Sequence, residues 1–297
     1  MGELTPIKQR IVDAAVEIQG EPLERIDFQH SVLCQVGLPR KAVEGTSFER
    51  ESGNVSLLLE AGRIYKAGKW VHQELPYGTR PRLLLMHICG EAKRRKSLEV
   101  PAGDSVRDFL RILGIDTSGG AKGGYTAFWK QMEALAACRL QLGMSFGGHD
   151  VTMNAQIIQR FDVWQRHDGD QRAAWPGSIT LTQEFYDSLM DHAVPLDHTA
   201  VAAIKHSALA LDLYTWLAHR LHRVNRPAGV RISLQALKSQ FGQEYADIKD
   251  FKKKLHIALR QVLIVYPDAK VEIVRGGLLL KKSNPPIGPR VLVSGVG

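Results

Sequence analysis

The chain has 297 residues, of which 44% are hydrophobic and 24% are charged, a composition typical of a folded globular protein that excludes a wholly disordered one. Its length allows two domains of ordinary size, each with its own core. A formal net charge of +8 favours an acidic partner such as nucleic acid. Positive charge is concentrated in the last fifth of the chain, at Lys238, Lys249, Lys252, Lys253, Lys254, Arg260, Lys270, Arg275, Lys281, Lys282 and Arg290.

The cysteines and the N-terminal segment indicate the compartment. Cys34, Cys89 and Cys138 show no metal-ligand spacing and predict free thiols in a reducing environment. Residues 1–19 include acidic side chains and lack the continuous apolar core of a secretion signal. No stretch approaches the roughly 20 apolar residues that a membrane span needs. We therefore expect a cytoplasmic protein with no membrane partner.

The first 52 residues are predicted to form an N-terminal helix and a linker. Apolar residues recur with a helical period over residues 4–19. Gly, Pro and charged residues dominate residues 37–53, which is typical of a linker. The first strand of the following domain is expected at residues 55–59.

The first predicted domain covers residues 53–166. Its long first helix begins at Leu83 and ends in a basic cluster, where cations suit the negative helix terminus. There follow a strand at 97–100, a helix that Ser105 opens and Gly114 ends, a glycine-rich loop at 118–124, a third helix at 125–138, and a hairpin of strands 139–146 and 151–164 that turns at Gly147–Gly148.

A linker at residues 167–177 leads to the second predicted domain, residues 178–285, and a tail at 286–297. Ser233 and Asp247 are predicted to cap its second and third main helices. The expected elements are a helix from Thr182 to residue 190, helices at 208–221, 234–241 and 248–261, and strands at 263–266, 271–274 and 278–281.

The two domains repeat one pattern of long helix, short helix, basic amphipathic helix and strands. At one constant offset, Phe128, Met132, Leu135, Ala136, Leu140 and Leu142 match Phe251, Leu255, Ala258, Leu259, Leu263 and Val265. This order is typical of the winged helix, whose third helix enters the DNA major groove. The pattern predicts an α+β fold with two tandem winged-helix domains that read adjacent stretches of duplex DNA.

The strongest candidate DNA-binding surface is the polar face of the third helix in the second domain, continued onto its hairpin. Basic side chains donate to guanine and neutralise phosphate. The candidates are Lys249, Lys252, Lys253, His256, Arg260, Arg275, Lys281 and Lys282. A charged helix face is often only a solvated face, but the winged-helix pattern around this one favours DNA.

The corresponding surface of the first domain is a weaker candidate for DNA binding. Its candidates are Lys122, Tyr125, Thr126, Lys130 and Gln131, with Arg94, Arg95 and Lys96 from the basic cluster. Trp129 is a large apolar side chain on the same helix. We therefore expect this domain either to make fewer phosphate contacts or to divide its surface between DNA and self-association.

Catalytic alternatives are disfavoured. The glycines around Lys122 suggest a phosphate-binding loop, but a Gly rather than Ser or Thr follows that lysine. His219 and His222 lie three residues apart on a helix with no nearby carboxylate or cysteine to complete a metal site. We expect no catalytic residue, no metal and no cofactor, and hence no enzyme.

Several short motifs resemble the plasmid-encoded RepA replication initiators. They are Leu75-Pro76-Tyr77-Gly78, Pro81-Arg82-Leu83-Leu84-Leu85, Glu91-Ala92 with Arg94, Leu113-Gly114 and Gly119-Gly120. The resemblance runs from about Val55 to Met144 and more loosely to about Ser283. It implies an initiator that binds repeated origin sites, called iterons, on a plasmid.

The resemblance also implies the partners and the later steps. Such an initiator promotes opening of adjacent AT-rich DNA, recruits the host initiator and replicative helicase, and can exchange between monomer and dimer. A winged-helix transcription regulator is the alternative, and a protein-interaction scaffold is a further one. Opening of neighbouring duplex would distinguish an initiator from a regulator.

Overall fold

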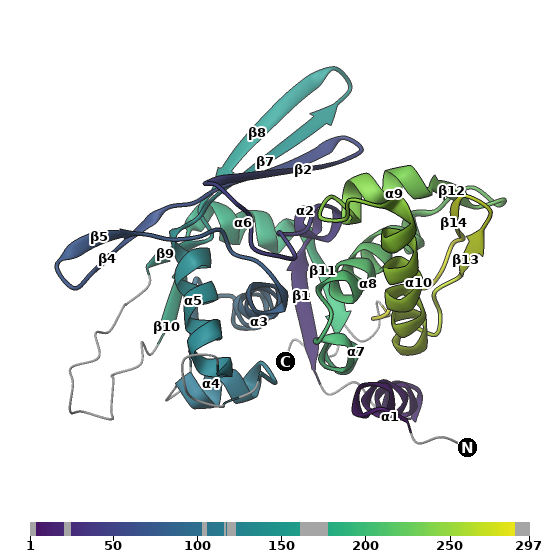
Figure 1. Cartoon of the computed structure of the whole chain (residues 1–297), viewed down its shortest axis with the longest axis horizontal. Coiled ribbons are helices and arrows are strands. Elements are labelled where there is room, and N and C mark those ends of the chain that lie inside the picture. Colours follow the sequence, from purple (N-terminus) through teal and green to yellow (C-terminus); the bar gives the residue numbers. More distant parts are fainter. Residues whose placement is uncertain are drawn as a thin grey trace. The chain divides into compact units, whose positions relative to one another are not determined.

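The computed structural model describes residues 4–20, 25–102, 106–115, 117, 123–160 and 178–288 (Figure 1). The chain divides into two compact units. Unit 1 consists of Met1–Gly37 with Ala193–Gly297, and unit 2 consists of Leu38–His192. Both units combine helices with small antiparallel sheets, so the fold class is α+β. Among the described residues, no helix is both long enough and apolar enough to cross a membrane.

This division differs from the boundaries expected from the sequence. The first 37 residues belong to the same unit as the C-terminal third of the chain, rather than forming a leader to the first domain. The helix that Thr182 caps belongs to unit 2. The linker expected at residues 167–177 and the end of the tail lie outside the described residues.

Unit 1 is built from helices and two small sheets, which come from the N-terminal segment and from the C-terminal third of the chain. Its elements are α1 (Pro6–Gly20), β1 (Ile26–His30), α2 (Ser31–Gln35), β11 (Ala193–Asp197), α7 (His198–Ile204), α8 (Ala208–Arg220), the 3-10 helix η1 (Leu221–Arg223), β12 (Val230–Ser233), α9 (Leu234–Phe241), α10 (Ile248–Val265), β13 (Val271–Val274) and β14 (Gly277–Leu280).

Two features connect the N-terminal segment to the rest of unit 1. Strand β1 pairs antiparallel with β11, in a register that places Ile26 opposite Asp197. Helix α1 packs against α7 and α10 through its buried residues Ile11 and Ala14. The Arg10 Nε donates a hydrogen bond of 3.1 Å to the Ala203 carbonyl in α7. The N-terminal helix is therefore a structural part of this unit.

The C-terminal half of unit 1 places three helices beside a three-stranded sheet of order β12–β14–β13. Ser233 caps α9 by accepting from the Ala236 amide at 3.1 Å, as the sequence predicts. The Trp216 and Phe241 rings meet edge to face with centroids 5.3 Å apart, which joins α8 to α9. Helix α10 buries Phe251, Leu255 and the rest of its apolar face against this core.

Unit 2 carries more strand than unit 1. Its elements are β2 (Ser47–Ser52), β3 (Val55–Glu60), β4 (Arg63–Lys66), β5 (Lys69–His72), α3 (Thr79–Arg95), β6 (Glu99–Pro101), α4 (Val106–Ile112), α5 (Gly124–Ala137), β7 (Arg139–Phe146), β8 (His149–Ala155), β9 (Ile158–Arg160), β10 (Ser178–Leu181) and α6 (Gln183–His192).

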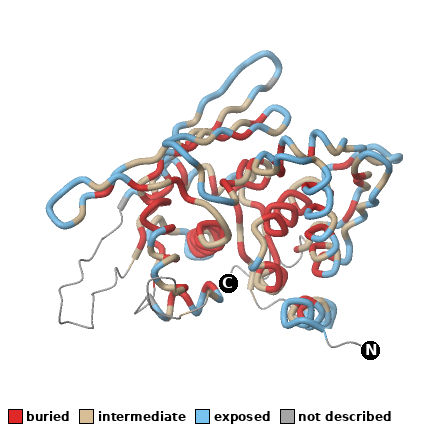
Figure 2. The backbone as a smooth tube through the Cα atoms, in the orientation of Figure 1, coloured by how far each residue is buried: buried red, intermediate tan, exposed pale blue. Residues whose placement is uncertain are grey.

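Three sheets and four helices organise the described part of unit 2. The sheets have the orders β2–β3–β7–β8, β6–β10–β9 and β4–β5. Phe109 of α4 lies between His87 of α3 and Phe128 of α5, with ring centroids 5.2 Å and 5.9 Å away. Figure 2 shows that burial is concentrated on these helices, whereas the hairpin ends are exposed. The β7–β8 hairpin turns at Gly147 and Gly148, which both have positive φ, as the two-residue turn requires.

Two local predictions are wrong. The expected linker at residues 37–53 contains β2, which pairs along its whole length with β3. The expected strand at Leu263–Tyr266 is instead mostly the last turn of α10, because Val262 and Val265 continue the buried face of that helix. The sequence repeat therefore holds through the third helices: Phe128 and Met132 are buried as Phe251 and Leu255 are, but the segments after these helices differ.

Candidate nucleic-acid interface

Helix α10 presents the densest set of cations in unit 1. Asp247 begins the helix by accepting a hydrogen bond of 2.8 Å from the Lys249 amide. Because its apolar face is buried, the opposite face is left to solvent and carries the exposed side chains Lys249, Lys252, Lys253 and Arg260. No ion pair between described residues engages these four cations. Their charge is therefore available to an external anion.

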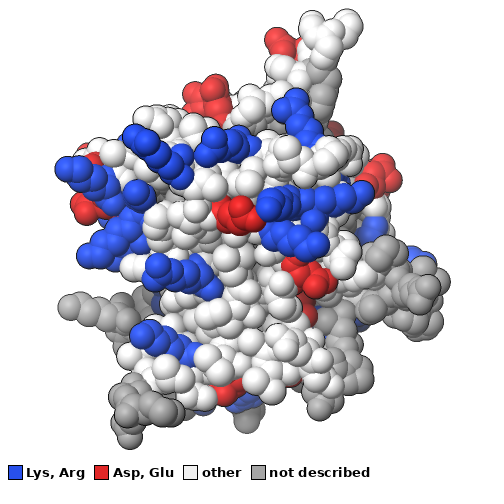
Figure 3. Space-filling model, turned by 90° about the vertical axis from the view of Figure 1, so that its right-hand side faces the viewer, with Lys and Arg blue, Asp and Glu red and all other residues white. Residues whose placement is uncertain are grey.

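Figure 3 shows the side of unit 1 on which α10 and the β13–β14 hairpin lie in Figure 1. Lys and Arg side chains are spread over this face, with fewer acidic side chains among them. Arg275 occupies the exposed two-residue turn between β13 and β14, and Lys282 is exposed beyond β14. Lys281 differs from these because its ammonium contacts Glu272 of β13. Arg275 and Lys282 thus add to the α10 surface two cations without an acidic partner among the described residues.

His256 lies on the same helix and is half-buried. Its pKa lies below the usual value of 6.5, first because burial disfavours the charged ring and then because Lys252 and Arg260 repel a further positive charge. This environment favours the neutral imidazole. In that state the ring offers one donor and one acceptor rather than a further charge on this face.

The corresponding helix of unit 2, α5, is already occupied by contacts within its own unit. The Lys130 ammonium lies 3.0 Å from a carboxylate oxygen of Glu74. Gln131 is only 5% exposed; its side-chain oxygen accepts from the Tyr77 amide at 2.6 Å, and its side-chain nitrogen donates to Glu74 at 2.9 Å. Gln131 is therefore a structural residue in this conformation, contrary to the expectation that it faces DNA.

The start of α5 contains the remaining sequence candidates of unit 2. Thr126 is exposed and Tyr125 is half-buried, and both have contacts within the chain. Lys122 lies outside the described residues. Trp129, considered for a protein neighbour, donates its indole N–H to Glu133 at 2.9 Å. The structure therefore leaves α5 with less free positive charge than α10.

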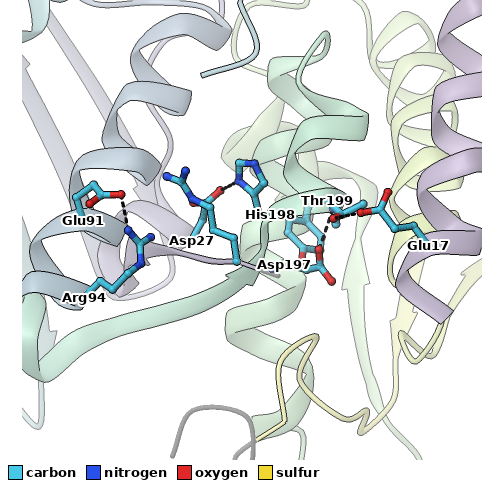
Figure 4. Close-up of polar contacts among 10 residues, drawn as sticks. Glu17, Asp27, Glu91, Arg94, Asp197, His198 and Thr199 are labelled. Carbon is cyan, nitrogen blue, oxygen red and sulfur yellow. Dashed lines mark hydrogen bonds and ion pairs between the residues drawn. The ribbon is translucent and has the colours of Figure 1, made fainter. Parts of the chain in front are cut away.

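The basic cluster at the end of α3 is also partly neutralised. Arg94 and Arg95 both contact the buried carboxylate of Glu91, one turn earlier in the helix, and the Arg95 Nε distance is 2.9 Å. Figure 4 shows the Arg94 contact. Burial opposes the shift, but hydrogen bonds from Arg95 and Arg94 and the charges of Arg94 and His87 lower the pKa of Glu91. Lys96 is exposed and ends α3 in the left-handed conformation, with φ of 52°.

The conspicuous Leu-Pro-Tyr-Gly motif has a structural role. Gly78 has φ of 82°, and its amide donates to the Pro39 carbonyl at 3.1 Å. Arg82 is buried and donates to the carbonyls of Leu38, Pro39 and Gly78 at 2.6 to 3.0 Å. The motif therefore fixes the start of α3.

Sequence reasoning missed the residues that fasten α5. Glu74 binds Lys130 and Gln131, and Glu133 binds Trp129 and the Lys66 ammonium, the latter at 2.6 Å. Glu74 and Lys66 lie more than 50 residues before their partners, as the separations of 57 and 67 residues show. No local pattern reveals contacts at such separations. The one available signal was the acidic residue directly before the Leu-Pro-Tyr-Gly motif.

Comparisons with known proteins agree with this architecture. Residues 75–235 match a family model described as plasmid encoded RepA protein, which is more than half of the chain. No curated protein sequence matches. A crystal structure of selenomethionine derivatives of domains 2 and 3 of RctB is similar in fold, with a TM-score of 0.50 and 12% identity, covering 90% of this chain and 96% of that chain. Helix α10 lies beyond the residues that match the family, so its identification as a candidate DNA-binding helix rests on its own geometry.

Proposed function

The chain belongs to the family of plasmid-encoded RepA proteins, and we propose that it initiates plasmid replication by binding repeated duplex sites at the origin. In this proposal each unit contains a winged helix. The elements are α8, β12, α9, α10, β13 and β14 in unit 1, and α3, β6, α4, α5, β7 and β8 in unit 2.

The observation that carries the proposal is the exposed positive face of α10, whose cations form no ion pair with a described residue. A third helix of this length, capped at its start and buried on one side, has the form of a recognition helix. Its N-terminal half, the part of such helices that reaches the base edges, contains Lys249, Lys252 and Lys253. Arg275, at the tip of the β13–β14 hairpin, provides a further cation for the sugar-phosphate backbone.

Unit 2 contributes differently in this proposal. Because Lys130 and Gln131 are bound to Glu74, α5 would supply fewer contacts with phosphates and bases than α10. Linking a strong and a weaker DNA-binding unit in one chain makes the second contact intramolecular, which raises affinity through an effective concentration of order millimolar. Candidate contacts of unit 2 remain Tyr125, Thr126 and Lys96, with Lys122.

The later steps are also part of the proposal. After binding, the protein would promote opening of adjacent AT-rich DNA and recruit the host initiator and replicative helicase, and self-association would restrain it. No catalytic group, metal or cofactor is assigned to any of these steps. We propose that they take place in the cytoplasm.

Permanganate footprinting tests the step that distinguishes an initiator. The full chain is added to supercoiled DNA that carries the origin region of its own replicon, with and without host replication proteins. The proposal expects thymines beside the bound repeats to become reactive only when the protein is present. Protected repeats with unreactive flanking thymines under all conditions would instead assign the chain to transcription regulation.

A further inference from the structure

The β4–β5 hairpin of unit 2 presents two aromatic rings to solvent. Tyr65 is 60% exposed and Trp70 is 66% exposed, which makes them the two most exposed aromatic side chains among the described large hydrophobics. They are directly opposed across the hairpin and meet edge to face, with ring centroids 5.5 Å apart. Figures 1 and 2 show the hairpin extending from the rest of unit 2, with its tip exposed. Water surrounds much of this aromatic surface in the free protein.

The two faces of this hairpin have different partners. Cross-strand pairing places Arg63 and His72 on the same face as the two rings, because side chains alternate along a strand. The opposite face carries the buried Ile64 and also Lys66, whose ammonium lies 2.6 Å from Glu133 of α5. The hairpin is thus anchored to α5 through its inner face. Its outer aromatic face is left for another molecule.

The turn of the hairpin holds this surface in place. Ala67 and Gly68 form a two-residue turn in which both residues have positive φ, 52° and 75°. Turns of this kind match the natural twist of the paired strands and keep their register fixed. The two rings are therefore held opposite each other before any ligand arrives, which reduces the entropy cost of binding.

The charges around the rings identify the class of ligand. The segment from Arg63 to His72 contains three cations, Arg63, Lys66 and Lys69, and no acidic residue. Arg63 is exposed on the same face as the rings, whereas Lys69 pairs with Lys66 on the opposite face. A partner for this surface must offer flat apolar faces together with negative charge. Single-stranded nucleic acid has both, because its bases expose the faces that a duplex keeps stacked.

We propose that the outer face of β4–β5 binds single-stranded DNA, with bases stacked on Trp70 and Tyr65 and a phosphate beside Arg63. Binding of this type tolerates many sequences, because every base has a face that can stack. This inference rests on the proposed initiator function for the origin of the single-stranded DNA, because opening a replication origin produces it. The stacking chemistry itself does not depend on that function.

The test measures binding of the full chain to a labelled oligothymidylate and, separately, to a duplex origin repeat. Trp70→Ala should weaken oligothymidylate binding by roughly 5- to 100-fold, the range expected for loss of one stacked base. Trp70→Phe should retain most of the affinity, because it preserves a flat ring. Val151→Ala is the matched control: it removes another exposed apolar side chain of unit 2, which is 47% exposed, and should leave binding unchanged.

A second pair of measurements guards against misfolding of the hairpin. Arg63→Gln keeps both rings and should make the dependence of oligothymidylate affinity on salt less steep. In the unaltered protein, photocrosslinking with an iodouracil-containing oligonucleotide should label Trp70 or Tyr65. Duplex affinity should remain within about twofold in all these variants if the surface is specific for single strands.

Three results would overturn the proposal. The first is an absence of oligothymidylate binding by the unaltered protein. The second is unchanged affinity in Trp70→Ala, which would leave a protein partner as the occupant of this face. The third is an equal loss of duplex and single-strand affinity. Intact duplex binding in the first two cases would leave the proposed initiator function standing, whereas loss of all DNA binding by the unaltered protein would remove that function as well.

Discussion

Lys253 of α10 and Lys130 of α5 differ in their ion pairs within the chain. Lys253 is exposed without an ion pair to a described residue, whereas Lys130 is bound to Glu74. Replacing Lys253 by Gln should reduce the slope of log affinity against log salt concentration by about one unit, because one phosphate contact is lost. Lys130→Gln should change this slope by less, since that ammonium must first leave Glu74. Duplex binding titrated at several salt concentrations measures both, and equal changes would contradict the assignment of α10 as the main contact.

We expect His256 to make the affinity for duplex DNA dependent on pH. Its pKa in the free protein lies below 6.5 because of burial and of the neighbouring Lys252 and Arg260. A nearby phosphate would favour the charged ring and raise this pKa, so binding would take up a proton. We expect affinity to rise as the pH falls from about 7.5 to about 6, and His256→Gln to remove much of that rise. An unchanged pH profile in the variant would place His256 outside the interface.

At the scale of elements, the β12–β14 pairing depends on a glycine. A Cβ added to Gly277 would lie 1.9 Å from the Ile232 carbonyl oxygen, so the strands could not keep their register. Gly277→Ala should lower the free energy of unfolding by roughly 2 kcal/mol or more. Gly288→Ala is the control, because its Cβ would meet nothing within 4 Å. Denaturant titration measures both, and equal stability of the two variants would contradict the β12–β14 geometry.

Asp197 begins α7 and makes stability dependent on pH. Its carboxylate accepts from the Ala200 amide at 3.1 Å, but burial raises its pKa above the usual 3.8 despite its backbone hydrogen bonds. A raised folded-state pKa means that the stability from this group is present below the unfolded pKa and is lost as pH rises through the folded pKa.

Replacing Asp197 by Asn should keep the helix cap. Because Asn does not ionise, the replacement should also remove the loss of stability that occurs as the pH rises. The stability of Asp197→Asn relative to the unaltered protein should therefore increase as the pH rises from the acid range towards neutrality. Asp197→Ala should be less stable by about 1 kcal/mol at any pH where the cap is intact in the parent. Thermal unfolding across this pH range measures the effect. An Asn variant with the same pH dependence as the parent would exclude Asp197 as its source.

Elements with local signals could be predicted from the sequence, whereas those formed by distant contacts could not. Asp247 and the periodic apolar residues locate α10 closely, and Gly147–Gly148 locates the β7–β8 turn. The β1–β11 pair joins residues 26–30 to 193–197, and neither strand contains a signal for the other. Strand β2 was missed because its charged residues read as a linker, although the exposed Glu49 and Glu51 alternate with the buried Arg50. The candidate interface shows the same difference between local and distant signals. The cations of α10 were predicted from the sequence, whereas the contacts of α5 with Glu74 were not.

At the scale of the whole molecule, the two units are unequal in the positive charge they leave available. Each contains a helix of the repeated pattern, but only the one in unit 1 keeps a row of cations that lack ion-pair partners among the described residues. This inequality predicts a DNA site with one strongly and one weakly specified part. A monomer would then read an asymmetric sequence, suited to directly repeated origin sites, whereas a two-fold symmetric dimer would favour an inverted repeat.

The central claim, that this chain reads duplex DNA through two unequal units, is tested most directly by selection from a random duplex library. The full chain is used at roughly 150 mM salt, where non-specific attraction to phosphates is weakened, and the bound pool is sequenced. We predict one asymmetric motif about two helical turns long, with stronger base preference in one half. Replacing Lys252 and Lys253 by Ala should weaken preference in that half alone. A pool without any enriched sequence would contradict the claim.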